Sequence, residues 1–222
     1  MSSGARDAAG TLTAEVSRRL RDRYDQASFG GDEAAFAAGL TEITALRGVI
    51  DLAHGKLLHT QFLGDHQDRP GELAAFERAA AAFGEAGEVR GEAEALFWVG
   101  CYHQVVHGDG EAALPWFARA KELAEAAGDE LTLSYVERHL GFIDWDAGRP
   151  GQARSRLERS LSLRRSLGFQ AGTAAALLAL AEFCASQGQS AEAGRYVTEA
   201  RQLAEACGAR GVLRWIDKDM GS

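Results

Sequence analysis

Two histidines four residues apart, His103 and His107, are the side chains with the spacing of a metal site. On a helix this spacing places both imidazoles on one face, and His66 or Asp65 from the preceding turn could add a third ligand. No HExxH motif and no pair of nearby cysteines accompanies them. We therefore expect His103 to pack between helices, His107 to cap a helix end, and the protein to bind no metal or other cofactor.

A second set of polar residues, His139, Asp146 and Glu182, could act in general acid–base chemistry if neighbouring helices bring them together. Their spacing does not require this, because solvated residues of a binding groove would show the same pattern. The sequence has no P-loop, GxGxxG, GxSxG or kinase-like motif. We assign no catalytic residue, and we keep enzymatic activity as an alternative.

The composition bounds the class of protein. The chain has 222 residues, of which 46% are hydrophobic and 25% charged, and its net charge is −8. An acidic chain is poorly suited to wrapping a phosphate backbone, so we expect no nucleic-acid partner. The start lacks an apolar signal segment, and the most apolar run, 174–181, is too short to span a bilayer. Three widely separated cysteines form no disulfide framework, which indicates a reducing compartment and hence a cytoplasmic protein. We also expect no membrane partner, since no apolar run is long enough to span a bilayer.

The elements that must position these residues are indicated by an internal repeat. At intervals of about 40 residues, a glycine ends a stretch rich in Ala, Leu and Glu, as expected of a helix C-cap. These glycines are Gly48, Gly87, Gly128, Gly168 and Gly208. A second series lies midway between the later ones, at Gly108, Gly148 and Gly188. Each repeat is therefore expected to be two helices joined by a turn that contains glycine.

The expected helices span 13–28 and 33–47, 50–63 and 71–86, 91–106 and 111–127, 131–146 and 151–167, and 171–186 and 190–207, with a short cap at about 211–218. Small and large residues recur at equivalent positions of the last three repeats: Ala113, Ala153 and Ala193; Phe117, Leu157 and Val197; Ala120, Ser160 and Ala200. Small residues let two helices approach closely, and the large residue fills the space between them.

This pattern resembles the tetratricopeptide repeat (TPR), in its extended form of about 40 residues as in kinesin light chains and in the helical arrays of bacterial regulatory ATPases. The resemblance implies an all-α, right-handed superhelical solenoid of about five antiparallel helix pairs with a short C-terminal capping helix. We expect one domain, 1–222, with repeats at about 11–48, 49–87, 88–128, 129–168 and 169–208 and a cap at 209–222. Arginine greatly exceeds lysine, which is typical of GC-rich genomes, and we expect a bacterial protein.

The same resemblance implies that the first helix of each pair lines a concave groove. The candidate ligand-binding residues on those helices are Phe97, Trp98, Cys101, Tyr135, Arg138, His139, Phe142, Trp145 and Glu182. Five aromatic rings on two neighbouring helices, with a few polar groups among them, are typical of a binding pocket. The alternative is that these rings pack against one another or against the terminal helix that carries Trp215.

Charged residues between the later helices add two expectations. Asp144 should face the partner helix, where its carboxylate needs a cation, and Arg154 is the expected mate. The arginine-rich stretch 149–165 is expected to form a solvated outer face or, alternatively, a docking patch for an acidic partner.

We therefore expect a non-catalytic scaffold that holds a peptide or protein segment in its groove, for which a regulatory role is one option. The first alternative is a sensor or enzyme that binds a small apolar ligand in the aromatic pocket. A self-associating adaptor is a further alternative, and the sequence does not set the oligomeric state.

Overall fold

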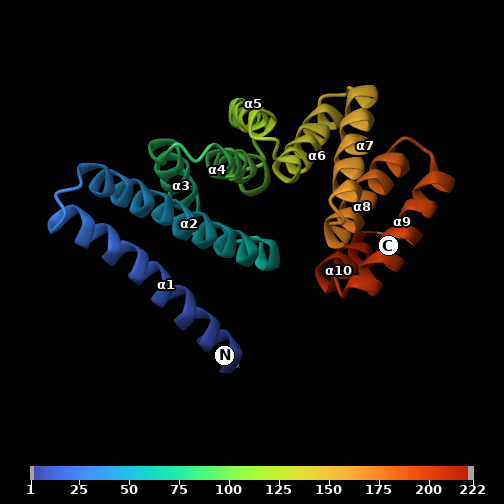
Figure 1. The fold of residues 1–222 in the computed structure, drawn as a ribbon. Helices are drawn as coiled ribbons and strands as arrows, with labels where there is room; N and C mark the ends of the chain where they lie inside the picture. Colours follow the sequence, from blue (N-terminus) through green and yellow to red (C-terminus); the bar gives the residue numbers. More distant parts are fainter. Residues whose placement is uncertain (1–2, 220–222) are drawn as a thin grey trace.

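A computed structural model describes residues 3–219, and this part of the chain is a succession of helices (Figure 1). The helices are α1 Ser3–Ser28, α2 Glu33–Asp65, α3 Glu72–Ala86, α4 Val89–Cys101, α5 Gly110–Ala126, α6 Glu130–Asp146, α7 Pro150–Ser166, α8 Gln170–Ser186, α9 Ser190–Cys207 and α10 Arg210–Asp219. A π-helical turn, η1, covers Tyr102–Val106. The predicted all-helical solenoid is confirmed.

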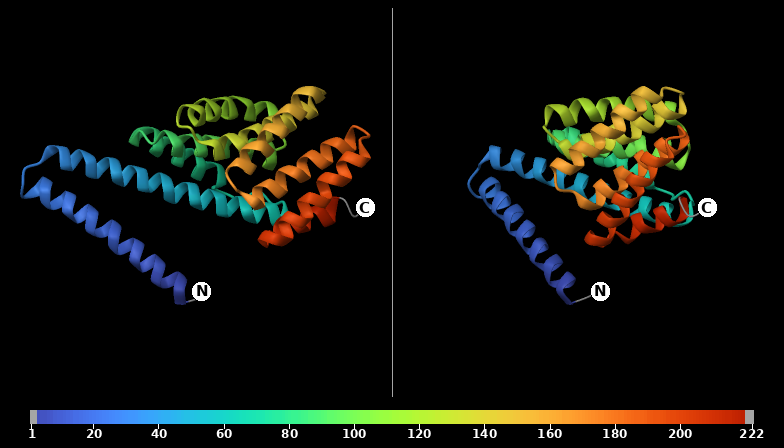
Figure 2. Two further views of the ribbon diagram at one scale, coloured as in Figure 1. Left: turned by 45° about the vertical axis from the view of Figure 1, so that its right-hand side comes forward. Right: turned by 90° about the vertical axis from the view of Figure 1, so that its right-hand side faces the viewer.

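Neighbouring helices pack in sequence order, with the closest pairings between α2 and α3, α4 and α5, α6 and α7, and α8 and α9. The array curves, and α1 diverges from it beside the first half of α2 (Figure 2). None of the helices within residues 3–219 combines the length and hydropathy needed to cross a bilayer.

The predicted small and large positions interlock as the repeat pattern requires. A Cβ on Gly100 would lie 2.7 Å from Cε1 of Phe117, and one on Gly141 would lie 3.1 Å from Cγ of Leu157. Ala113 and Ala153 are fully buried. The register predicted for the later repeats is therefore confirmed in the packing of α4 on α5 and of α6 on α7.

The predicted helix end at Gly48 is wrong. Gly87, Gly128, Gly168 and Gly208 have positive φ and follow helices as predicted, but Gly48 lies inside α2, which continues to Asp65. A Cβ on Gly48 would lie 3.0 Å from the ring of Phe83, so this glycine allows close helix packing instead of ending a helix. The expected boundary between repeats 11–48 and 49–87 therefore falls inside a continuous helix.

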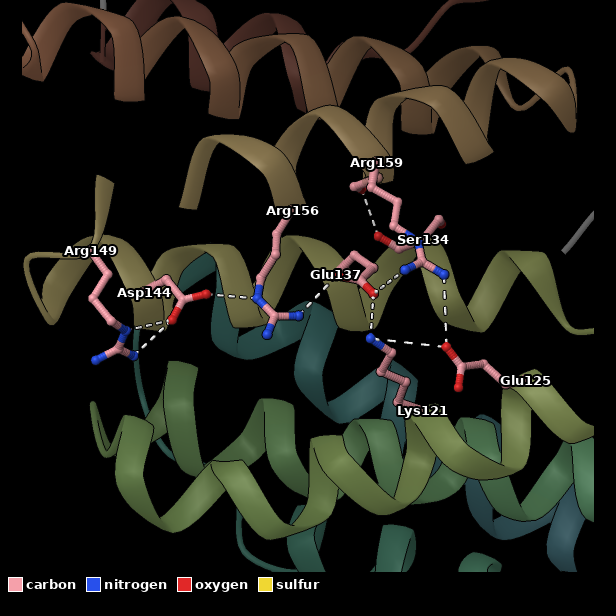
Figure 3. A network of polar contacts seen from close by, with 9 residues as sticks. Lys121, Glu125, Ser134, Glu137, Asp144, Arg149, Arg156 and Arg159 are labelled. Atoms are coloured by element: carbon pink, nitrogen blue, oxygen red, sulfur yellow. Dashed lines mark hydrogen bonds and ion pairs between the residues drawn. The ribbon is translucent and has the colours of Figure 1, made fainter. Parts of the chain in front are cut away.

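An ion-pair network fixes α6 between α5 and α7 (Figure 3). The carboxylate of Glu137, 2% exposed, lies 2.9 Å from Lys121 Nζ, 3.0 Å from Arg156 Nη1 and 3.4 Å from Arg159 Nη1. Asp144 bonds to Arg149 at 2.7 Å and to Arg156 at 2.6 Å. Several charges of the arginine-rich stretch therefore hold the helices together.

Two expectations for this stretch are corrected. Arg154, the expected partner of Asp144, instead pairs with Glu192 at 2.6 Å and with Glu158 at 2.8 Å, because it projects toward α9. Arg164, placed on the solvated face, is only 1% exposed because its side chain inserts between helices.

Candidate functional site

A concave pocket of about 460 Å³ lies between α2, α4, η1, α6 and α10. Its walls include seven of the residues predicted to bind a ligand: Phe97, Trp98, Cys101, Tyr135, Arg138, His139 and Phe142. The ring of Phe97 contacts three other rings of the wall, with centroids 5.2 Å from Trp98, 5.5 Å from Tyr135 and 5.2 Å from His139. The register of α4 and α6 brings these side chains to one surface.

The other two predicted residues, Trp145 and Glu182, lie outside this pocket wall. Trp145 packs edge-on against Phe183 at 5.5 Å, as part of the C-terminal core. Glu182 interacts electrostatically with Arg138. Both differ from the expected groove position because α8 contacts α10 as well as α6, and residues 172–181 of α8 are all buried.

Five further residues complete the pocket: His59 and Leu63 of α2, Gln104 and Val105 of η1, and Trp215 of α10. His59 and Leu63 lie within the predicted helix 50–63, but they are not among the candidate residues. The sequence did raise Trp215 as a packing partner of the rings, and its indole, 37% exposed, closes one side of the cavity without filling it. The pocket and packing alternatives are thus both partly realised.

The π-helical turn η1 directs Gln104 onto α6. His107 N–H donates to the Tyr102 carbonyl five residues earlier, at 3.4 Å. Gln104 Nε2 donates to the His139 carbonyl at 3.0 Å, and His139 Nδ1 donates to Gln104 Oε1 at 2.6 Å. The pKa of His139 is well below its ordinary value, because the ring is buried and because Arg138 lies nearby, so His139 is a neutral member of the wall.

Two arginines lie at the pocket, Arg138 in its wall and Arg164 against the ring of Tyr135. Arg138 lies in the wall with its guanidinium carbon 5.0 Å from the centre of the Phe142 ring. Arg164 lies 4.7 Å from the centre of the Tyr135 ring and donates from Nη1 to the Gly172 carbonyl at 2.9 Å. Burial lowers the pKa of Arg138, and burial together with Arg138 lowers that of Arg164 to about 9.

A cysteine, a histidine and a carboxylate also form a chain at the pocket. Cys101 Sγ lies 4.0 Å from His59 Nε2, and His59 Nδ1 lies 2.9 Å from Glu72 Oε1. This is the order of groups found in activated nucleophiles. Burial, however, raises the pKa of the Cys101 thiol to about 12, so the sulfur is protonated at neutral pH and the contact is a structural one.

The other residues singled out for chemistry are not brought together. His107 Nε2 bonds to the Tyr102 hydroxyl at 3.0 Å, and His103 stacks on Trp116 at 6.4 Å. Asp146 is exposed at the end of α6. No group of three or more His, Cys, Asp or Glu side chains with the arrangement of a metal site occurs within the described residues.

Two further hollows adjoin the pocket and share lining residues in series. One, of about 410 Å³, shares Tyr135 with the pocket, and the next, of about 750 Å³ beside α2, shares Arg90 and Glu94 with the first. The concave surface is therefore hollowed along three adjoining stretches, of which the aromatic pocket lies nearest to α10.

Comparison with known proteins gives little beyond the fold. No family model matches the chain, and no curated protein matches it. Among solved structures, it is similar to BtubC (BKLC) from P. vanneervenii, with 17% identity over 88% of this chain and 90% of that chain and a TM-score of 0.49. The structure itself establishes a helical repeat scaffold.

Proposed function

We propose that this protein is a non-catalytic binding scaffold of the TPR type whose concave pocket holds a small apolar ligand. The observation that carries the proposal is the cavity of about 460 Å³, with aromatic walls from α4 and α6 and further walls from α2 and α10. Its volume lies in the range of small-molecule sites, which combine apolar walls with a few polar groups. Three free cysteines support a reducing, cytoplasmic location.

A second candidate is the binding of a peptide along the whole concave surface. The two hollows that adjoin the pocket favour it, because an extended segment could cross them and place one side chain in the pocket. The small ligand is preferred because the pocket is bounded by α2 and α10, whereas an extended groove would continue past both.

The first test uses N-phenyl-1-naphthylamine, a neutral apolar dye that fluoresces in apolar surroundings. Trp98→Ala should weaken its binding by about 2 kcal/mol, or about 30-fold, because large aromatic side chains carry most of the binding energy of a site. Trp145→Ala should leave the affinity within about threefold of wild type, because Trp145 packs on Phe183 outside the pocket. The measurement is a fluorescence titration of each variant, after circular dichroism has shown that it is folded.

Leu114→Ala, on the outer face of α5 and 39% exposed before substitution, is the matched control for loss of an apolar side chain. Wild-type affinity in folded Trp98→Ala, or no binding by the wild type, would reject the pocket as the site. A peptide selected from a display library that binds tightly and displaces the dye would favour the second candidate, because that candidate places one side chain in the pocket.

A further inference from the structure

The aromatic pocket contains a positive charge, that of Arg138, for which residues 3–219 supply no hydrogen-bonded or ion-paired partner. We propose that its ligand is an organic acid, with an aromatic or branched apolar body and one carboxylate that binds Arg138. This inference rests on the proposed function, and it adds the chemical class of the ligand.

Arg138 is placed to meet a ligand. It forms part of the pocket wall, and its Nε is buried without a hydrogen-bond partner. Within the described part of the chain, no hydrogen bond or ion pair of Arg138 is found, and the carboxylate that acts on it electrostatically is that of Glu182. A partly buried guanidinium whose Nε has no partner loses hydration without compensation, so an anion that enters with a ligand would offset part of this cost.

Arg164 adds a second positive charge behind the ring of Tyr135. Its Nη2 is also buried without a partner, although Nε and Nη1 bond to Ser134 Oγ and to the Gly172 carbonyl. Arg138 lowers the pKa of Arg164, and both arginines lower the pKa of His139 in the pocket wall, so their fields overlap there. An anion beside Arg138 would therefore be attracted by both charges.

No Asp or Glu is among the described residues that line the pocket. Glu94 is paired with Lys56 at 2.8 Å, and Glu72 is bonded to His59 through Oε1 while its Oε2 is buried without a partner. Glu182 is the carboxylate whose charge interacts with that of Arg138. The remaining walls are mainly rings and aliphatic groups, which suit an apolar body and offer few donors for a dianion such as a phosphate. A single carboxylate on an apolar body fits this arrangement best.

The test compares 2-naphthylacetate with 2-naphthylacetamide, which have nearly the same shape and differ in charge. Isothermal titration calorimetry should show that wild-type protein prefers the acid by about tenfold or more, because a charge-assisted hydrogen bond replaces a neutral one. Arg138→Met should bind both compounds with similar affinity, and Arg138→Lys should keep part of the preference.

Arg119→Met is the matched control, because Arg119 is exposed on α5 and pairs with Glu122 at 3.1 Å. It should keep the wild-type preference. Arg138→Met removes an unpaired buried charge, so its melting temperature should equal or exceed that of the wild type. If it does not fold, Arg138→Gln replaces it, and the comparison of acid and amide in the wild type stands without either variant.

The outcomes separate the two proposals. Equal affinity for acid and amide, or binding of the neutral dye but not of the acid, would overturn the organic-acid inference and leave the apolar pocket intact. Retention of the preference in folded Arg138→Met would also overturn it. Failure of the dye, the acid and the amide to bind would reject the proposed function itself.

Discussion

Glu137 offers a direct test of how the scaffold holds the pocket in place. It precedes Arg138 on α6, and its buried carboxylate contacts Lys121 of α5 and Arg156 and Arg159 of α7 (Figure 3). Glu137→Ala would remove the common acceptor of three cations from two helices. We expect a loss of stability together with a weaker pocket, since α6 carries much of the wall.

The size of the loss follows from the burial of each partner. Removing one member of a fully buried ion pair costs about 3–5 kcal/mol, because the other charge is left unpaired. Here the side chains of Lys121, Arg156 and Arg159 are 27%, 33% and 50% exposed, so they can regain hydration. Arg156 also keeps its bond to Asp144 at 2.6 Å. We therefore expect Glu137→Ala to lower the free energy of unfolding by about 2–3 kcal/mol.

The assay is urea unfolding followed by circular dichroism, with a thermal melt that should show a decrease of about 5–10 °C for a chain of this size. Glu125→Ala is the matched control, because Glu125 contacts Lys121 and Arg159 at 3.9 and 3.7 Å but is 48% exposed. Its cost should be below about 1 kcal/mol. Equal effects of the two substitutions would refute the conclusion that burial makes Glu137 the centre of the network.

Three further predictions address α2, α6 and the buried thiol. Gly55→Ala should lower the free energy of unfolding by about 1–2 kcal/mol, measured by urea unfolding, because the added Cβ would lie 2.5 Å from Cε1 of buried Phe76. Gly64→Ala in the same helix is the control: its Cβ would meet no atom within 4 Å, so this substitution should be neutral or stabilising. The pKa of His139 in the folded protein is well below its ordinary value of 6.5, so the unfolded chain takes up the proton first and the free energy of unfolding should fall as the pH decreases below about 6.5. His139→Asn should make this fall with pH less steep, and an unchanged pH dependence would contradict the lowered pKa of His139. The Cys101 thiol, with its pKa raised to about 12, should react with Ellman's reagent about 1,000-fold more slowly than an ordinary thiol at neutral pH, and rapid modification of the folded protein at Cys101 would contradict its burial.

Much of the fold could be predicted because the glycine pattern reports local backbone geometry. Gly87 and Gly208 adopt positive φ at helix ends, where other residues are strained. Gly48 and Gly55 have a different role, since each lets an aromatic ring of α3 approach the backbone of α2. A single sequence does not distinguish these roles, because the second depends on which helix packs opposite.

The pocket could be predicted only where it follows the repeat register. Phe97 and Tyr135 lie on first helices whose inward faces recur at the repeat period. His59 of α2 and Trp215 of α10 also line the cavity, because the array is curved and brings these two helices to it. The curvature is the sum of small rotations between successive helix pairs, which a single sequence does not specify. Arg164 was expected in solvent because its neighbours are polar, and its burial depends on contacts with other helices.

A crystal structure of the protein with 2-naphthylacetate tests the central claim most directly. The account predicts the naphthyl group among the rings of Phe97, Trp98 and Phe142, with a carboxylate oxygen within hydrogen-bond distance of the Arg138 guanidinium. A ligand bound instead on the outer face near Lys121, or between α1 and α2, with the pocket unoccupied, would contradict it.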